Sequence, residues 1–297
     1  MNPREKGFLL LSSHLGDPDR KPLSRFQLRT LAERVSGMDL PVEDRELALS
    51  DLIGLGYSRD MAARILALLG QTEELAYYLS RGKGAGCVPI TRVSTGYPAV
   101  LRQRLGLDSP GCLWAKGDLR LLRKPAVALV GSRDLMEENR LFAKAVGEMA
   151  ARNGFVLVSG NARGADRAAQ DACLASGGRV ISVLADKLTD HEERENLLYL
   201  SEDGYAEPFS AQRALSRNRC IHALGQLTFV AQSDLGKGGT WDGTVKNLRR
   251  GWSTVVCFRD GSPSSLEMEH LGAYLIGMEE MKDFSFTVMT EKSLFEE

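Results

Sequence analysis

The middle of the chain alternates short apolar runs with amphipathic segments and turns of small residues. Residues 126–130 form a run of five apolar residues that is too short for a helix. Apolar residues then recur at helical spacing over 141–150, and a second short run occupies 155–158. This order predicts a strand–helix–strand unit. In a parallel sheet, ligands bind beyond the carboxyl ends of the strands, so the turns at 131–133 and 159–166 are the first candidates for a site.

The same alternation continues to about residue 260. It predicts further strands over 180–184, 227–231 and 254–258, and further helices over 165–176, 192–200, 217–224 and 240–250. Strands that alternate with helices indicate an α/β fold with a doubly wound parallel sheet of about five strands. We expect residues 87–124 to approach this sheet and pack on it, and residues 261–297 to add an acidic helix and one further strand.

The first third of the chain has a different pattern. Apolar residues at helical spacing over 26–35, 47–53 and 61–69 predict a small helical domain. The Gly54-Leu55-Gly56 turn has the outline of a helix-hairpin-helix, whose turn amides can bind a DNA phosphate; the alternative is a tight helical connection. The glycine-rich residues 82–86 predict a flexible linker. The expected domains are therefore 1–86, 87–260 and an acidic extension over 261–297.

Charge is spread unevenly over the 297 residues, although the net charge is only −1. Residues 1–124 carry 19 Lys and Arg against 14 Asp and Glu, whereas residues 261–297 carry 2 against 8. A basic front with an acidic tail is compatible with a nucleic-acid partner without requiring one. Five cysteines without a Cys-x-x-Cys pair indicate reduced thiols in a cytoplasmic protein and argue against a zinc site. No run of 18 apolar residues occurs, so we expect no membrane span.

The turn at 131–133 matches neither the Walker loop nor the Gly-x-Gly-x-x-Gly fingerprint of dinucleotide-binding folds. Its residue types nevertheless suit an anion. Gly131 lets the backbone approach a ligand closely, Ser132 adds a hydroxyl, and Arg133 can bind a phosphate through two N–H groups. The alternative interpretation is an ordinary strand-to-helix turn with a solvated arginine.

Four motifs in this order resemble the DNA-processing protein A (DprA/Smf) family. They are Tyr97-Pro98, Gly131-Ser132-Arg133, Ser159-Gly160-x-Ala162-x-Gly164-x-Asp166 and Arg217-Asn218-Arg219. The resemblance covers about residues 25–260. It implies a Rossmann-like sheet and a cytoplasmic protein, commonly a homodimer, that binds single-stranded DNA. Family members help load a RecA-type recombinase onto incoming strands during natural transformation, without turnover, and the resemblance implies no metal and no cofactor.

The resemblance and the glycine-rich turn at 236–240 together predict the phosphate-binding residues. These are Gly131, Ser132, Arg133, Ser159, Gly160, Arg163, Gly164, Arg217, Asn218, Arg219, Lys237, Gly238, Gly239 and Thr240. The two arginines of the helix have an alternative interpretation as solvated side chains. Asp166 is interpreted as a carboxylate that stabilises the start of a helix rather than as a general acid or base.

The chain also departs from the family pattern. Gln170 stands where the family commonly has His, Asp190-His191 replaces its Tyr-Pro, and Ala206-Glu207-Pro208 lacks its serine. The Gly238-Gly239-Thr240 turn is more similar to nucleotide-binding relatives such as the cytokinin-activating LOG proteins. The alternative function is therefore an enzyme or sensor that acts on a nucleoside phosphate, with Glu207 as acid or base. An interaction module in phage defence is a third, weaker possibility.

Four further side chains invite a functional interpretation. His222 lies on an apolar helix face, where a histidine is more often a core residue than a catalytic one. Trp114, Trp241 and Trp252 have rings on which bases could stack, and Trp241 is the nearest to the predicted pocket in sequence. The alternative for Trp241 is a packing residue at a helix start.

Overall fold

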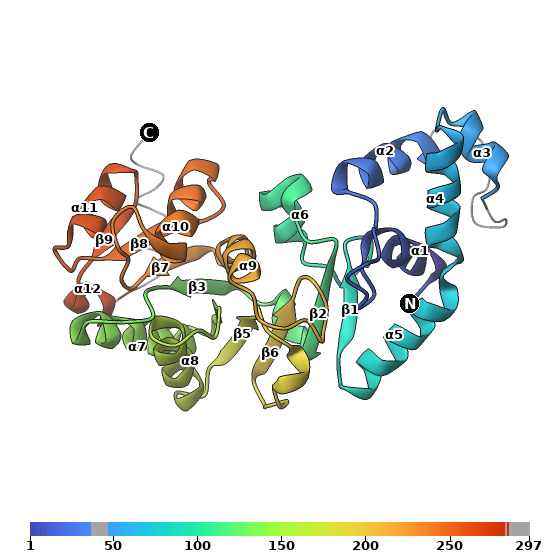
Figure 1. Ribbon diagram of the computed structural model, residues 1–297. Coiled ribbons are helices and arrows are strands. Elements are labelled where there is room, and N and C mark those ends of the chain that lie inside the picture. Colours follow the sequence, from blue (N-terminus) through green and yellow to red (C-terminus); the bar gives the residue numbers. More distant parts are fainter. Residues whose placement is uncertain (37–46, 283, 285–297) are drawn as a thin grey trace. The chain divides into compact units, whose positions relative to one another are not determined.

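The computed structural model describes residues 1–36, 47–282 and 284, and its contacts divide the chain into two compact units. The first unit contains residues 1–97, 110–114 and 202–207, and the second contains the rest (Figure 1). The predicted boundaries at 86 and 260 differ from this division, because two later segments belong to the first unit and the described part of the acidic extension belongs to the second. The end of that extension lies outside the described residues.

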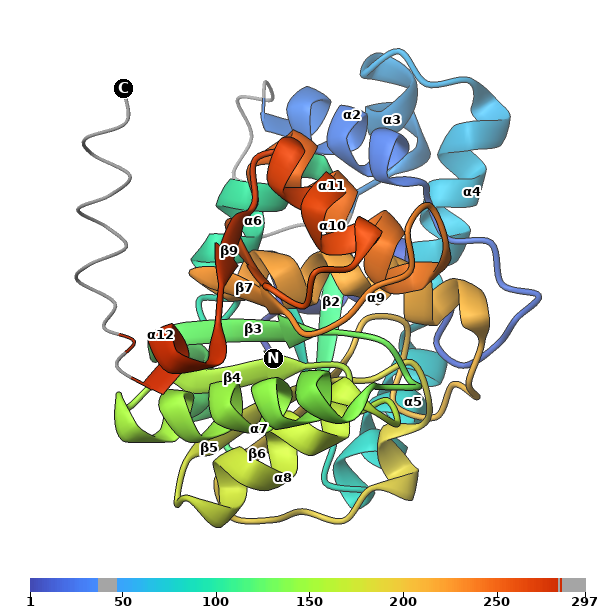
Figure 2. The same cartoon turned by 90° about the vertical axis from the view of Figure 1, so that its left-hand side faces the viewer.

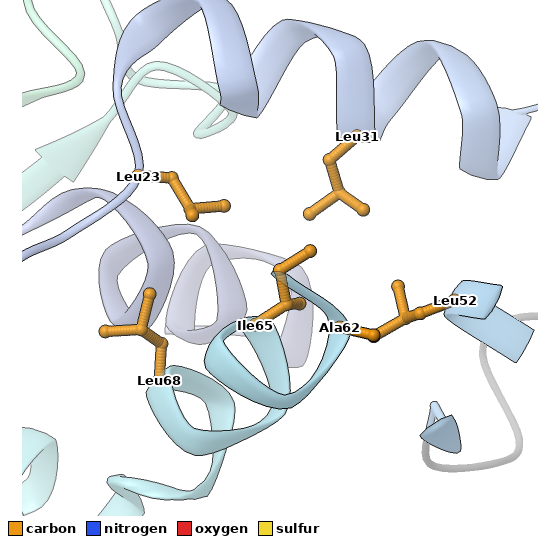
Figure 3. Close-up of a cluster of buried hydrophobic side chains, with 6 residues drawn as sticks. All are labelled: Leu23, Leu31, Leu52, Ala62, Ile65 and Leu68. Carbon is orange, nitrogen blue, oxygen red and sulfur yellow. The ribbon is translucent and has the colours of Figure 1, made fainter. Parts of the chain in front are cut away.

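The first unit is mainly helical. Its elements are α1 (Pro3–Ser12), α2 (Arg25–Ser36), α3 (Leu49–Gly54), α4 (Arg59–Gly70), α5 (Thr72–Gly84) and β1 (Val88–Thr91). The three amphipathic segments form α2, α3 and α4 and bury one apolar cluster (Figure 3). Its members are Leu23, Leu31, Leu52, Ala62, Ile65 and Leu68. The pattern did not predict α1, although its start is specified by a capping box in which Asn2 and Glu5 bond each other's backbone N–H.

The helix α5 contradicts the predicted linker at 82–86. The helix continues through Gly84, and Gly82 is buried against two aromatic rings: a Cβ placed there would lie 3.0 Å from both Trp114 and Tyr205. Glycine at this position therefore provides close packing rather than flexibility. Trp114 is only 1% exposed and sits edge-on to Tyr78 and Tyr205, so it has no face for a DNA base, and the stacking interpretation is wrong for this residue.

The turn between α3 and α4 keeps the geometry of a tight helical connection. Gly56 has a φ of +82°, which a side chain would disfavour, and the Ser58 hydroxyl accepts a hydrogen bond from Met61 N at 3.3 Å to start α4. A DNA-binding role for this turn stays a prediction.

The second unit is built on a parallel sheet. Its strands are β3 (Ala126–Val130), β4 (Val156–Ser159), β5 (Arg179–Val183), β6 (Leu197–Ser201), β7 (Leu227–Val230), β8 (Thr254–Phe258) and β9 (Tyr274–Ile276). Their spatial order is β6-β5-β4-β3-β7-β8-β9, and every neighbouring pair in it is parallel. Strand β2 (Cys112–Gly117) begins in the first unit beside β1 and ends in the second beside β6.

Helices cover both faces of this sheet, as a doubly wound fold requires. Figure 2 shows α7 (Glu137–Arg152) and α8 (Ala165–Ala175) on one side of β3 and β4, and α9 (Ala211–Leu224) on the other, next to α10 (Gly238–Arg250). The remaining helices are α6 (Ala99–Leu105), α11 (Pro263–His270), α12 (Met278–Lys282) and three short 3-10 helices, η1 (Gly106–Asp108), η2 (Leu119–Arg123) and η3 (Leu188–Asp190). The predicted fold class is confirmed.

Three sequence predictions about the sheet are wrong. The helix predicted over 192–200 is instead a loop followed by β6, since residues 197–200 pair with β5 and every residue of the strand is buried. The approach segment contributes β2 to the sheet instead of only packing on it, and β2 and β6 together make the expected five strands too few. Strand β9 agrees with the further strand expected over 261–297. The thiols match the prediction, because all five cysteines are free and buried. Among the described residues, no helix has the length and hydropathy to cross a membrane.

Helices α7 and α8 pack closely because Gly147 lies at their contact. A Cβ at this position would overlap the carbonyl oxygen of Ala169 in α8. We predict that Gly147→Ala destabilises the protein by about 1–3 kcal/mol, since backbone must shift to make room. Gly7→Ala, in α1, is the matched control: its Cβ meets nothing within 4 Å, so the better helix propensity of alanine should raise stability by up to about 1 kcal/mol. Urea denaturation checks both, and equal effects would contradict the packing argument.

Candidate phosphate-binding site

The candidate site lies where the sheet changes its winding direction. Strands β3 and β7 are neighbours, with Val130 opposite Val230, but β3 leads into α7 on one face and β7 into α10 on the other. The two connections therefore diverge and leave a crevice at the carboxyl ends of the strands. A cavity of about 380 Å³, called the first cavity here, occupies this position.

The turn after β3 is held firmly at the edge of the first cavity. Ser132 N donates to Gln232 O at 3.0 Å, and Ser132 O accepts from Ala165 N at 3.1 Å. Gly131 permits this arrangement, because a Cβ there would lie only 2.5 Å from that of Ala165. The exposed Arg133 side chain then reaches the cavity wall.

The turn after β4 is fixed by a buried carboxylate. Asp166 Oδ2 accepts hydrogen bonds from Gly160 N at 3.1 Å and from Ala162 N at 3.2 Å. Burial raises the pKa of Asp166, while the charge of Arg217 and the two N–H groups oppose that rise. Asp166 thus orders the start of α8, as the sequence interpretation favoured. Gly164, with a φ of +91°, packs directly on the turn after β3, where any Cβ would overlap Arg133 O.

Helix α9 brings Arg217 and Asn218 to the cavity. The Arg217 guanidinium donates to Gly160 O at 3.0 Å and is largely buried. It lies against Gly160 so closely that a Cβ there would overlap it, which explains the glycine. Asn218 Nδ2 donates to Gly239 O at 3.1 Å and ties α9 to the start of α10.

The start of α10 forms the remaining wall. Lys237 occupies the N-cap position without a side-chain cap, and Gly238, Gly239 and Thr240 line the cavity in the first turn. The N–H groups of a first turn have no partner within the helix and carry partial positive charge, so they attract anions. Ser233 adds a hydroxyl that the sequence analysis missed. It is 9% exposed, and its Oγ has no hydrogen-bond partner in the part of the chain that the structure describes.

A second cavity of about 420 Å³ adjoins the first and shares Arg133, Ala162 and Arg217 with it. Predicted residues Gly160 and Arg163 also line it, and Arg163 forms an exposed ion pair with Asp134 at 2.8 Å. Two of its other wall residues, Phe209 and Asp186, were missed. No local motif marks them, because they follow different elements and meet only in the folded unit.

Three predicted residues line neither cavity: Gly164, which packs on the turn after β3, and Arg219 and Ser159. Arg219 is two positions from Arg217 on α9, so its side chain leaves the helix on a different side and donates to Asp108 O at 2.9 Å. Ser159 is fully buried under the turn, where its hydroxyl accepts from Gln170 Nε2 at 2.7 Å. Gln170 in turn accepts from Ser182, so the residue that departs from the family pattern completes a polar network in the core.

The remaining candidates are placed as follows. Trp241 is half-buried and Trp252 lines a separate cavity beside the start of β8; neither lines the two cavities described above. Glu207 belongs to the first unit, whereas both cavities are built by the second, so its role as an acid or base stays a prediction. In the described ranges, no three His, Cys, Asp or Glu residues are grouped as a metal site.

His222 is a core residue of α9, as its sequence position indicated. It is 1% exposed, its Nδ1 lies 3.2 Å from Asn247 Nδ2, and burial lowers its pKa to about 3. The unfolded chain binds a proton at this histidine near pH 6.5, whereas the folded protein resists protonation down to about pH 3. Protonation therefore favours the unfolded state throughout that window.

We predict that His222→Leu removes this part of the acid sensitivity. Between pH 6 and 5, the unfolding free energy of the wild type should fall relative to the variant by up to about 1.4 kcal/mol per pH unit. Urea unfolding of both proteins from pH 7.5 to 5 measures the difference, and parallel pH curves would contradict the assignment.

Comparisons with known proteins identify relatives of this chain. Residues 89–250 match the family model described as DNA recombination-mediator protein A. The chain is 35% identical over 144 residues to DNA processing protein DprA of Streptococcus pneumoniae and 29% identical over 164 residues to that of Bacillus subtilis. The match to the Streptococcus pneumoniae protein covers 44% of this chain and 50% of that protein, and the match to the Bacillus subtilis protein covers 51% and 54%. The chain therefore spans about half the length of the curated relatives it matches.

Solved structures show the same fold. The X-ray structure of DprA from Streptococcus pneumoniae superposes with a TM-score of 0.66 at 24% identity and covers 89% of this chain and 99% of that one. A structure of DprA from Helicobacter pylori gives 0.56 at 23% identity, over 69% of this chain and 96% of that one. Every residue that lines the two cavities lies within residues 89–250, the range that matches the family model.

Proposed function

We propose, from the premise that this chain belongs to the DNA recombination-mediator protein A family, that its first cavity binds the phosphate backbone of single-stranded DNA. One observation carries the proposal. The turn at 131–133, the guanidinium of Arg217 and the uncapped start of α10 converge on a single cavity, which also contains the unpartnered hydroxyl of Ser233.

The chemistry of the cavity suits a phosphate better than a neutral ligand. Backbone N–H groups, three hydroxyls and the cations of Arg133, Arg217 and Lys237 can all donate hydrogen bonds or positive charge. Two carboxylates, Asp166 and Asp234, also line the cavity, and Asp166 offsets the charge of Arg217. Three cations against two carboxylates still leave the wall with a net positive charge. A ligand recognised through its phosphates is bound with little regard to base sequence.

Single-stranded DNA is the form of phosphate polymer that the relatives support. The Helicobacter pylori DprA structure is described by its single-stranded DNA binding mode, and the curated relatives are named DNA processing proteins. We extend the family role to this chain: it would assist a RecA-type recombinase on incoming DNA during natural transformation, acting as a homodimer and without turnover. No motif identifies the recombinase contact, so no residues are assigned to it.

A second candidate is binding or conversion of a free nucleoside phosphate. The Gly238-Gly239-Thr240 turn at the start of α10 favours it, since one helix start and the Ser233 hydroxyl suffice for a single terminal phosphate. This candidate requires Glu207 for chemistry, whereas the DNA-binding proposal does not.

Salt-dependent binding of a fluorescent oligo-dT tests the proposal. Each phosphate contact contributes about 0.7 to the slope of log affinity against log salt for a single strand. We predict that Arg133→Ala and Arg217→Ala each weaken binding and reduce that slope by about 0.7. Arg133 is exposed, so its variant should fold normally even if loss of the buried Arg217 destabilises the second unit.

Arg249→Ala is the matched control. Arg249 is an exposed arginine at the far end of α10 and lines neither cavity, so its removal should leave the slope nearly unchanged. Equal losses in all three variants would indicate a diffuse electrostatic effect. Failure of the folded wild type to bind at low salt would refute the proposal.

Thermal unfolding with nucleoside mono-, di- and triphosphates separates the second candidate from the first. A free nucleotide that is the true ligand should raise the melting temperature at concentrations well above its Kd, and Glu207→Gln should abolish any conversion of it. The DNA-binding proposal predicts a small shift from nucleotides and unchanged oligo-dT binding by Glu207→Gln.

A further inference from the structure

A third cavity, of about 400 Å³, lies at the opposite edge of the sheet from the two described above. Gln226 in its wall directly precedes β7, and Thr254 begins β8, so this cavity lies at the amino ends of the strands. Helix α10 connects the two edges: its first turn lines the first cavity and its last turns line the third. All residues of the third cavity belong to the second unit. A ligand here occupies a site separate from the proposed DNA phosphate.

The cation of the third cavity is Arg104, a half-buried residue of α6. Its Nη1 donates hydrogen bonds to the carbonyl oxygens of Ala223 and Gly225 at the end of α9, which fixes the guanidinium at the cavity wall. Nε and Nη2 form the remaining edge of the guanidinium, and neither has a hydrogen-bond partner among the described residues. Two parallel N–H groups on such an edge match the two oxygens of one carboxylate.

The charge of Arg104 is not balanced within the part of the chain that the structure describes. In that part, Arg104 forms no ion pair, and no Asp or Glu lines the third cavity. Burial lowers the pKa of Arg104 without an opposing carboxylate, whereas Arg217 of the first cavity has the charge of Asp166 beside it. Because a half-buried cation without a counter-ion is costly, an anionic ligand relieves this arrangement.

Two aromatic side chains make the rest of the wall suitable for a flat organic group. Trp252 lies in the turn before β8 and Tyr274 begins β9; both are half-buried and line the cavity. The turn is fixed, since Gly251 ends α10 in the left-handed conformation and the buried Asn247 bonds Ser253 twice, accepting from its N at 2.9 Å and donating to its Oγ at 3.0 Å. The indole is therefore in place before a ligand arrives, which reduces the entropic cost of binding.

We propose that the third cavity binds a small aromatic carboxylate, whose carboxylate pairs with the Nε and Nη2 edge of Arg104 and whose ring packs on Trp252. The volume of the cavity lies in the range of small-ligand sites and accommodates one or two fused rings. A phosphate monoester fits less well, because it carries a charge of about −1.5 to −2 and Arg104 is the single cation of the described wall. This inference does not depend on the proposed DNA binding, which uses the opposite edge of the sheet.

Isothermal titration calorimetry of the full chain with 2-naphthoate and with its uncharged analogue 2-naphthamide tests the site. The readout is the ratio of the two Kd values at neutral pH and one fixed salt concentration. We expect the wild type to bind 2-naphthoate about tenfold more tightly than 2-naphthamide, because only the carboxylate forms a charge-assisted pair of hydrogen bonds.

Variants of Arg104 and Trp252 separate the two halves of the site. Arg104→Gln should bring the ratio of Kd values near one. Arg104→Lys keeps the charge and a donor for the two carbonyl oxygens but lacks the paired edge, so its ratio should fall to about three. The lysine variant decides the question even if Arg104→Gln fails to fold. Trp252→Leu should weaken binding of both compounds by a factor of about 3–10 through lost ring contact.

Arg102→Gln and Trp241→Leu are the matched controls. Arg102 is an exposed arginine of the same helix as Arg104, and Trp241 is a half-buried tryptophan near the other end of α10; neither lines the third cavity. Both variants should keep the wild-type affinities and ratio. Equal wild-type affinities for the two compounds, or a wild-type ratio that persists in Arg104→Lys, would overturn the carboxylate site.

Competition with DNA locates the compound. Saturating oligo-dT should leave the affinity for 2-naphthoate unchanged, because the first and third cavities lie at opposite ends of α10. Displacement of 2-naphthoate by DNA would place the compound in the DNA site and overturn the inference. Failure of oligo-dT itself to bind would refute only the proposed function, since the ratio of Kd values is measured without DNA.

Discussion

The buried carboxylate of Asp166 is the constraint on which the candidate site depends. It holds the N–H groups of Gly160 and Ala162 and thereby sets the path of the chain between β4 and α8. The carbonyl of Gly160 accepts from Arg217, so the same turn positions the guanidinium between the two cavities. A carboxylate without compensation at this depth would be costly, and the adjacent cation and N–H groups reduce that cost.

Three glycines allow the surrounding turns to come close enough for this network. Gly131 and Gly164 bring the turns after β3 and β4 into direct backbone contact, and Gly160 admits the guanidinium of Arg217. The glycine-rich appearance of these motifs therefore reflects packing around Asp166 as much as access for a ligand. The phosphate-binding surface that we propose combines the Arg217 guanidinium with groups outside this network: Ser132, Arg133, the first turn of α10 and Ser233.

Much of this arrangement could be predicted from the sequence, because it depends on local patterns. Strands β3, β4 and β7 are short apolar runs, and the turns that follow them carry the glycines of the site. The family membership, which the motifs also predicted, is confirmed by the match over residues 89–250. The sequence analysis predicted a helix where β6 lies, because a run of about five apolar residues is compatible with either a helix or a strand. Pairing with β5, a tertiary contact, makes this segment a strand.

Features that depend on tertiary contacts could not be predicted. Arg217 and Arg219 belong to one motif, yet their side chains leave α9 on different sides. Arg217 reaches the cavities, whereas Arg219 donates a hydrogen bond to the carbonyl oxygen of Asp108. Phe209 and Asp186 come from separate loops, and only the fold brings them to one cavity wall. Ser233 belongs to no motif, and only the fold shows that its hydroxyl is buried in the cavity wall without a partner among the described residues.

A crystal structure of the chain with a short oligo-dT tests the central claim most directly, because it locates phosphorus atoms without relying on variants. The account predicts a phosphate in the first cavity, within hydrogen-bond distance of the Arg217 guanidinium, the N–H groups at the start of α10 and the Ser233 hydroxyl. A strand bound elsewhere on the chain, with the first cavity holding no phosphate, would contradict it.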